Sequence, residues 1–304
     1  MKKLYLLGHP VSHSLSPIMQ NAAIQHFGLD WHYETLDVPP ENLVATLEEL
    51  EADPEVIGCN VTVPHKVKVY EWLGESRCEP EAIAAHAVNT LFKNVENRFR
   101  GDSTDASGGI YAMGIEAPVG PNSDLRYEDI AILGTGGSAS TFGCRLARAP
   151  IHPDTRSLII FGRTPERGSD LANRIREAYP RSTVAIGSDE LGNFAAWNLK
   201  RRSLVIQTTT VGMASGTAPG QSPVPSDSVH AGQMAFDLVY NPHDTPFLQY
   251  AAANGAKTVH GIYMLVAQGA LAFKAWLDAS DLEGTGDRFL ISETIHVMRT
   301  ALGV

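Results

Sequence analysis

The chain has 304 residues and a formal net charge of −10 at pH 7, with 43% hydrophobic and 19% charged residues. This composition is that of an ordinary globular protein, and the length favours two domains that each bury a core. An acidic chain is a poor candidate for binding nucleic acid through bulk electrostatics, so an anionic ligand must be held by locally placed donors. The sequence therefore disfavours a nucleic-acid-binding module.

The cysteines and the N-terminus indicate the cell compartment. Cys59, Cys78 and Cys144 form no CxxC pair and show no metal-ligand spacing, which is typical of a reducing compartment and predicts no metal site. The apolar run 4–7 stops at Gly8, too early for a signal peptide, and no apolar stretch is long enough to span a bilayer. We therefore expect a cytoplasmic protein without a membrane partner.

The first hundred residues alternate between strand and helix patterns. We predict a helix over 18–27, with Ser16 as its N-cap and Pro17 at its first position. The other predicted elements are strands over 4–7, 33–38 and 56–63, a helix over 40–51, and a hairpin of 88–93 with 98–100. These elements predict an α/β domain over residues 1–104.

The rest of the chain has the pattern of a parallel sheet. A helix begins near Thr104, and 117–128 is a loop. Continuous apolar runs then predict buried strands over 130–133, 158–161, 184–186, 204–206 and 235–238. Helices between the strands predict a doubly wound sheet over 105–261. Two helical patterns within 262–297, separated near Gly284 and Gly286, return to complete the first domain, which therefore includes 262–304.

A glycine run joins the first strand of that sheet to the next helix. It reads Gly134-Thr135-Gly136-Gly137-Ser138-Ala139-Ser140, with Ser140 at the third glycine position of the usual dinucleotide fingerprint. Glycines let the backbone approach a pyrophosphate, and the N–H groups of the helix stabilise its charge. Flexible turns can look the same, but the strand before and the helix after favour a Rossmann-type dinucleotide site.

The end of the second strand indicates which cofactor binds. An acid there binds the ribose hydroxyl of NAD, whereas an arginine accommodates the 2′-phosphate of NADP. Here the strand is followed by Arg163 and Arg167 and by no acid at its tip. NADP is therefore favoured over NAD. The alternative is that both arginines are solvated surface charges, or that Glu166 pairs with Arg167.

Polar clusters follow the strands of the first domain. Ser14 and Ser16, two residues apart, could present a pair of hydroxyls from an extended loop. Alternation predicts that Asn60, Thr62 and Lys66 share one side while Val61 and Val63 lie in the core. The remaining clusters are 87–90, with Asn89, and 101–105, with Asp105. Asp105 is either a helix cap or the partner of Lys66, and a single lysine is more often a solvated surface charge.

Eight segments together resemble the shikimate dehydrogenase family, which includes quinate/shikimate dehydrogenases. They are HSLSP at 13–17, NVTVPHK at 60–66, AVNT at 87–90, GDSTD at 101–105, GTGGS at 134–138, GRT at 162–164, DLVYNPHDTPFL at 237–248 and GIYMLVAQGALAFKAW at 261–276. The resemblance implies reversible reduction of 3-dehydroshikimate to shikimate by NADPH, a step of aromatic amino acid biosynthesis. It also implies an N-terminal substrate-binding domain beside a Rossmann-type NADP-binding domain, facing a shared cleft.

The resemblance assigns roles to individual residues. Lys66 and Asp105 would form the catalytic pair. The substrate would be bound by Ser14, Ser16, Asn60, Thr62, Asn89, Tyr240 and Gln268. The cofactor would be bound by Gly134, Thr135, Gly136, Gly137, Ser138, Arg163, Thr164, Arg167, Thr209, Leu238, Gly261 and Met264.

The chain departs from the family pattern at a few positions. They are Gln20 for a histidine, Ser103 for an asparagine, Gly162 for an asparagine, and 207–210, which reads QTTT for NATS. Substrate preference and cofactor affinity therefore stay open. The alternatives are a quinate-preferring enzyme that uses NAD and a non-catalytic ligand sensor on the same fold. We expect a monomer or a homodimer.

Overall fold

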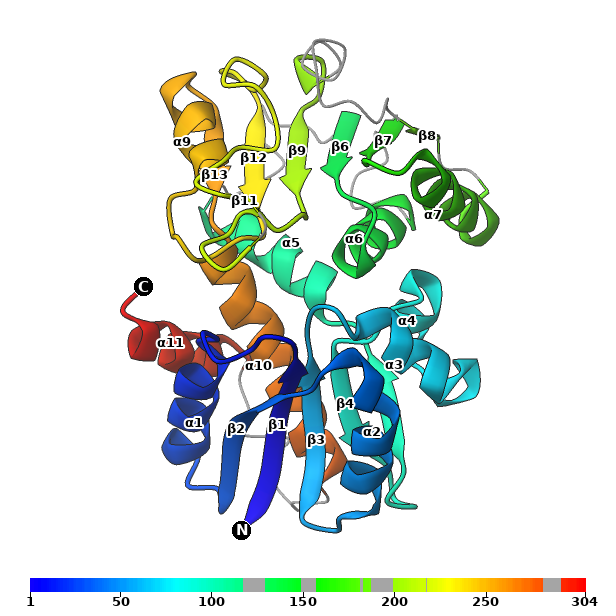
Figure 1. The fold of residues 1–304 in the computed structure, drawn as a ribbon. Coiled ribbons are helices and arrows are strands. Elements are labelled where there is room, and N and C mark those ends of the chain that lie inside the picture. Colours follow the sequence, from blue (N-terminus) through cyan, green and yellow to red (C-terminus); the bar gives the residue numbers. More distant parts are fainter. Residues whose placement is uncertain (117–128, 149–156, 181–182, 187–198, 217, 281–290) are drawn as a thin grey trace. The chain divides into compact units, whose positions relative to one another are not determined.

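A computed structural model describes residues 1–304 apart from 117–128, 149–156, 181–182, 187–198, 217 and 281–290. The chain forms two compact units, one made of Met1–Gly108 with Leu265–Val304 and the other of Gly109–Met264. Figure 1 shows both. The predicted loop over 117–128 and the helix break near Gly284 and Gly286 lie outside the described residues.

The first unit is built on a five-stranded sheet in the order β2-β1-β3-β4-β5. Its strands are β1 (Lys2–Gly8), β2 (Trp31–Asp37), β3 (Val56–Val61), β4 (Thr90–Lys93) and β5 (Phe99–Asp102). β1 pairs in parallel with β2 and β3, whereas β4 is antiparallel to β3 and β5. The predicted hairpin is confirmed by the β4–β5 pair. The carboxyl ends of β1, β3 and β5 and the amino end of β4 therefore share one edge of the sheet.

Helices cover both faces of this sheet. Leu4 and Leu6 pack with α1 (Ser16–His26), α10 (Gly261–Ala279) and α11 (Ile291–Leu302) in one core cluster. Leu7 packs on the other face with α2 (Leu43–Ala52) and α3 (Lys66–Leu73). Short helices η1 (Pro40–Asn42), η2 (Glu75–Arg77) and α4 (Pro80–Ala85) complete the unit. Alternation along β1 produces the two faces, and the predicted return of the C-terminal helices to the first domain is confirmed (Figure 1).

Two local predictions in this unit are wrong. β3 ends at Val61, because residues 62–65 turn, with the His65 N–H donating to the Thr62 carbonyl at 2.9 Å. Val63 is therefore 54% exposed instead of buried in the core. Ser16 is not the N-cap of α1. The helix already includes Ser16, Leu15 occupies the cap position, and no side chain caps the helix.

The second unit is a six-stranded parallel sheet in the order β13-β12-β9-β6-β7-β8. The strands are β6 (Asp129–Leu133), β7 (Ser157–Phe161), β8 (Val184–Ile186), β9 (Leu204–Gln207), β12 (Met234–Asp237) and β13 (Lys257–Val259). Read from β8 to β13 and numbered by their place in the chain, the strands run third-second-first-fourth-fifth-sixth, which is the strand order of a Rossmann fold. The order reverses between β6 and β9. The predicted doubly wound sheet is confirmed. A small pair, β10 (Val211–Gly212) with β11 (Ala218–Pro219), lies outside it.

Among the described residues of the second unit, four helices belong to it in whole or in large part. They are α5 (Asp105–Glu116), α6 (Gly137–Ala147), α7 (Pro165–Ala178) and α9 (Pro246–Ala253). Near the start of the unit, Gly109 allows α5 to pack closely, since an added Cβ would lie 2.2 Å from the ring of Phe142 on α6. Of the helices that the structure describes, none has the length and apolar character needed to cross a membrane.

Candidate active site

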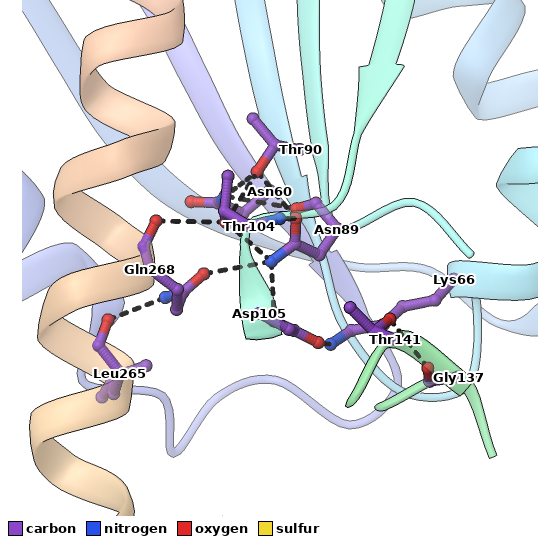
Figure 2. Close-up of polar contacts among 10 residues, drawn as sticks. All are labelled: Asn60, Lys66, Asn89, Thr90, Thr104, Asp105, Gly137, Thr141, Leu265 and Gln268. Atoms are coloured by element: carbon purple, nitrogen blue, oxygen red, sulfur yellow. Dashed lines mark hydrogen bonds and ion pairs between the residues drawn. The ribbon is translucent and has the colours of Figure 1, made fainter. Parts of the chain in front are cut away.

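Lys66 and Asp105 form an ion pair in the first unit. Lys66 is the first residue of α3 and Asp105 the first residue of α5. The ammonium nitrogen contacts Oδ2 of Asp105, and the two side chains are only 13% and 5% exposed (Figure 2). A cation is unfavourable at the N-terminus of a helix, where the backbone dipole is positive. The carboxylate offsets this cost and holds the lysine in place, so this lysine is not a solvated surface charge.

Asn89 connects the ion pair to a second group of polar side chains. Its Nδ2 lies 2.7 Å from Oδ1 of Asp105, 2.9 Å from Oγ1 of Thr104 and 3.3 Å from Oε1 of Gln268. An amide nitrogen has two hydrogens and can serve two of these acceptors at once. Its Oδ1 accepts from the Thr104 N–H at 2.8 Å and the Thr90 hydroxyl at 2.9 Å. Both ends of the amide are thus fixed, as Figure 2 shows.

Asn60 is oriented by a tyrosine from another strand of the sheet. The Tyr33 hydroxyl donates to Oδ1 of Asn60 at 2.9 Å, and Nδ2 of Asn60 donates to the Asn89 carbonyl at 3.2 Å. Tyr33 is itself held by Asn21, whose amide bonds both its backbone N–H and its carbonyl, at 3.0 and 2.8 Å. Sequence reasoning missed Tyr33 and gave no role to Thr90 or Thr104. The alternation of β2 places Tyr33 on its buried side, but a tyrosine there is equally typical of a core.

Three hydroxyl groups follow β1 and β3 at the same edge of the sheet. The Oγ atoms of Ser14 and Ser16 are 3.2 Å apart. The loop is a turn, with the Ser14 N–H donating to the Val11 carbonyl at 3.0 Å, instead of the extended segment we expected. Thr62 is half-buried, and its hydroxyl has no hydrogen-bond partner in the part of the chain that the structure describes. These hydroxyls can donate to a carboxylate or a ring hydroxyl.

The second unit carries the glycine turn at the point where its strand order reverses. Gly134 follows β6 with φ +127, and an added Cβ would lie 2.4 Å from Oγ1 of Thr208, which follows β9. Only glycine fits there without strain. Gly136 has open space where a side chain would be, and α6 begins at Gly137. The N–H groups of a first helical turn lack helical partners, so this turn fits a pyrophosphate.

Arg163 and Arg167 lie beyond the end of β7. Both are exposed, as is Thr164 between them, and neither guanidinium forms an ion pair with a described residue, Glu166 included. Gly162, just before Arg163, packs against the glycine turn that follows β6, because an added Cβ would lie 2.4 Å from Cγ2 of Thr135. Two cations of this kind beside a pyrophosphate cradle fit an additional phosphate, as NADP carries.

Apart from Ser138 in α6, the remaining predicted cofactor residues lie after β9, β12 and β13. The buried Gln207 amide bonds the Thr209 N–H and hydroxyl at 2.8 and 2.9 Å and so shapes the turn. Leu238 lies against Gly261, where an added Cβ would be 2.5 Å from the Leu238 carbonyl oxygen. Met264 is buried in α10, three residues on. Ser138, in the first turn of α6, is half-buried, as is Tyr240. The predicted carboxylate contact of Tyr240 stays a prediction.

Asp237, the carboxylic acid at the end of β12, has a pKa near neutrality. Asp237, the last residue of β12, is fully buried. Burial raises its pKa to about 7, against the opposing effect of hydrogen bonds from the Thr245 hydroxyl and the Val239 N–H, at 2.6 and 2.9 Å. These bonds fix the start of the loop that contains Tyr240.

A Rossmann-type sheet with its glycine turn and exposed arginines, in a chain whose other unit holds a half-buried lysine paired with a buried carboxylate, has the features of an NADP-dependent oxidoreductase. Comparisons with known proteins narrow the class. The family model "Shikimate dehydrogenase substrate binding domain" matches residues 6–91. The chain is 37% identical to the shikimate dehydrogenase (NADP(+)) of Methanopyrus kandleri, covering 89% of this chain and 88% of the relative. It is 36% identical to that of Moorella thermoacetica, covering 98% and 92%.

A comparison with solved structures points to the same family as the sequence relatives. The crystal structure of shikimate 5-dehydrogenase from Thermus thermophilus, in complex with NADP(H) and shikimate, aligns with a TM-score of 0.75 at 32% identity. The alignment covers 99% of this chain and 100% of that one. The chain belongs to the shikimate dehydrogenase family.

Proposed function

We propose that this chain catalyses the reversible, NADPH-dependent reduction of 3-dehydroshikimate to shikimate. The observation that carries the proposal is the ion pair between half-buried Lys66 and buried Asp105, tied through Asn89 to Gln268. Reduction of a ring ketone builds negative charge on its oxygen, so the reaction needs a proton donor held at that atom. Among the described residues of this polar network, Lys66 carries the cationic donor.

The proton chemistry follows from the contacts of Lys66. Its Nζ would donate a hydrogen bond to the carbonyl oxygen, then transfer a proton, and would take it back in the reverse direction. Asp105 aims the ammonium group through Oδ2 while its Oδ1 accepts from Asn89 at 2.7 Å. A carboxylate held at both oxygens cannot swing away, so the donor stays positioned through the cycle.

Substrate recognition would use the hydroxyl and amide groups around this pair. Ser14 and Ser16 are proposed to bind the carboxylate, with Tyr240 assigned on family resemblance alone. The ring hydroxyls are proposed to contact Asn60, Thr62, Asn89 and Gln268. Uncharged donors suit this task, because an arginine there would compete with Lys66 for Asp105.

The cofactor would be held by the second unit. The residues at 134–138 would bind the pyrophosphate, and Arg163, Thr164 and Arg167 the phosphate on the adenosine. Thr209, Leu238, Gly261 and Met264 would lie along the nicotinamide half. When bound, NADPH supplies the hydride that reduces the ketone carbon. The open space at Gly136 and the exposed arginines support this assignment.

One assay tests the proposal and its alternatives together. Absorbance of reduced nicotinamide near ~340 nm is followed with shikimate or quinate and with NADP or NAD. The proposal expects the largest kcat/KM for shikimate with NADP. A larger kcat/KM for quinate with NAD would establish the quinate-preferring alternative. Ligand binding without turnover in any of the four mixtures would establish a sensor.

We also propose a cytoplasmic location, with a monomer or a homodimer as the working form. All three cysteines are buried thiols, and burial raises the pKa of Cys59 to about 12 and of Cys144 to about 11. Such thiols are poorly ionised and inert. This pattern supports a reducing compartment, and the sedimentation coefficient of the purified chain distinguishes the two oligomeric states.

A further inference from the structure

The second unit carries a group of metal-ligating side chains that the proposed function does not use. It consists of His243, Asp244 and His260, which we call the His–Asp–His cluster. One ligand atom from each residue lies within 4.8 Å of the others. Within the described ranges, no other set of three His, Cys, Asp or Glu residues meets this spacing.

Sheet topology brings the cluster together from separate segments. β12 and β13 are parallel neighbours, with Phe236 paired to Val259. The carboxyl ends of parallel neighbours lie at one edge of a sheet. His260 follows β13 directly, and the chain that leaves β12 reaches His243 and Asp244 before α9 begins. The cluster thus lies at the carboxyl edge of the sheet beside its last two strands, and not at the reversal of strand order between β6 and β9.

Packing holds both segments in this arrangement. Gly261, next to His260, lies so close to the other segment that an added Cβ would be 2.5 Å from the Leu238 carbonyl oxygen. The Thr245 hydroxyl donates to buried Asp237 at 2.6 Å, and Nε2 of Gln249 donates to the Asp244 carbonyl at 3.0 Å. The backbone on each side of the cluster is therefore anchored before any ion binds.

The distances within the cluster suit a small ion with nitrogen and oxygen ligands. Oδ1 of Asp244 lies 3.4 Å from Nδ1 of His243 and 3.1 Å from Nε2 of His260. Ligand atoms around a tetrahedral zinc ion, with bonds of about 2.1 Å, are about 3.4 Å apart. A nitrogen of each imidazole is near the same carboxylate oxygen. The rings are stacked, with centroids 4.3 Å apart and planes at 18°, so one ring must rotate about its side-chain bonds for both nitrogen lone pairs to point at one ion.

We propose that the His–Asp–His cluster binds a divalent transition-metal ion such as Zn²⁺, with water at the remaining position. Two imidazoles and one carboxylate favour such an ion over Mg²⁺ or Ca²⁺, which prefer all-oxygen sites. Asp244 and His243 are 65% and 47% exposed, so the ion can enter from solvent. This proposal is independent of the proposed catalytic activity.

The test is a direct measurement of Zn²⁺ binding to the full chain after treatment with a chelator. Competition with a chromophoric chelator gives the stoichiometry and the dissociation constant. We expect one ion per chain, and at least about tenfold weaker binding in His243→Ala and in His260→Ala, since even residues behind the ligands contribute this much. His32→Ala is the matched control, because His32 is an exposed histidine of β2 outside the cluster, and it should bind as the unaltered chain does.

Three results would overturn the proposal. They are no Zn²⁺ bound, affinity unchanged in both histidine variants, or equal displacement of Zn²⁺ by Mg²⁺. Asp244→Asn guards against a folding defect in the histidine variants, because it keeps the size of the side chain and removes the anionic ligand. The absorption spectrum of Co²⁺ bound in place of Zn²⁺ reports the number of ligands around the ion. Hydrogen bonds within the cluster alone would give no such spectrum.

Discussion

The two units fix the groups assigned to each of them in different ways. In the first, side chains bond one another, so that Lys66, Asp105, Asn89 and Tyr33 each have a fixed partner. In the second, the backbone forms the cradle at Gly134 and Gly136, and Arg163 has no ion-pair partner among the described residues. Proton transfer requires a donor held within hydrogen-bond reach of the reacting atom. Holding a phosphate requires charge and backbone donors, which tolerate more freedom.

The largest effect is expected from removing the proton donor of the first unit. Lys66→Ala should lower kcat by at least ~10²-fold, the usual cost of losing a general acid–base group. Steady-state kinetics with shikimate and NADP measures it. Lys68→Ala is the control, since this residue of the same helix is 71% exposed and pairs with Glu71. A kcat of Lys66→Ala equal to that of Lys68→Ala would remove Lys66 from the chemistry.

The next effect is expected in the second unit. Arg163→Ala should lower kcat/KM for NADPH by about 10- to 100-fold, because a hydrogen bond to a charged group contributes about 1.5–3 kcal/mol. The value for NADH should change little, since NADH lacks the phosphate, and it serves as the internal control. Equal losses with both cofactors would show that Arg163 does not read the phosphate.

A smaller effect tests how rigid the polar network of the first unit is. Tyr33→Phe removes the donor to Oδ1 of Asn60 and should raise the KM for shikimate about fivefold, equivalent to about 1 kcal/mol. kcat should stay within about twofold, because Lys66 and Asp105 keep their contacts. Tyr5→Phe, on the opposite face of the sheet, should change neither constant. An unchanged KM in Tyr33→Phe would mean that Asn60 needs no orientation.

The smallest effect is a pH dependence of stability in the second unit. Burial raises the pKa of Asp237 from 3.8 to about 7. Between these values the folded chain retains a proton that the unfolded chain has lost, so this group stabilises the fold at low pH and its contribution is lost as pH rises. The Tm of the natural chain relative to Asp237→Asn should therefore fall from about pH 4 to about pH 7.

The control for this experiment is a carboxylate whose pKa is lowered instead of raised. Asp227 is exposed, and its hydrogen bond with Lys200 lowers its pKa. Any contribution it makes is therefore present at neutral pH and lost on acidification, and it should be small because the pair is solvated. If the Tm difference for Asp237→Asn does not change with pH, Asp237 does not titrate in this range.

Elements with a strong local signal were predictable. The apolar runs of β6, β7 and β9 and the glycine turn after β6 were identified from the sequence, and the Rossmann-type sheet follows from them. Val63 was placed in the core because strand alternation was carried two residues too far, past the turn that ends β3. Ser16 was assigned as the N-cap because a serine before a proline looks like a helix start, whereas its hydroxyl lies beside that of Ser14.

The sequence by itself determined the order of elements and the family, because strand periodicity, glycine turns and motifs are local patterns that survive without any contact being known. Tertiary structure decided which distant residues meet. Tyr33 reaches Asn60 only because β1 pairs with both β2 and β3, and His260 meets Asp244 only because β13 is parallel to β12. Strand pairing and register are set by the packing of whole faces, which no short stretch of sequence contains.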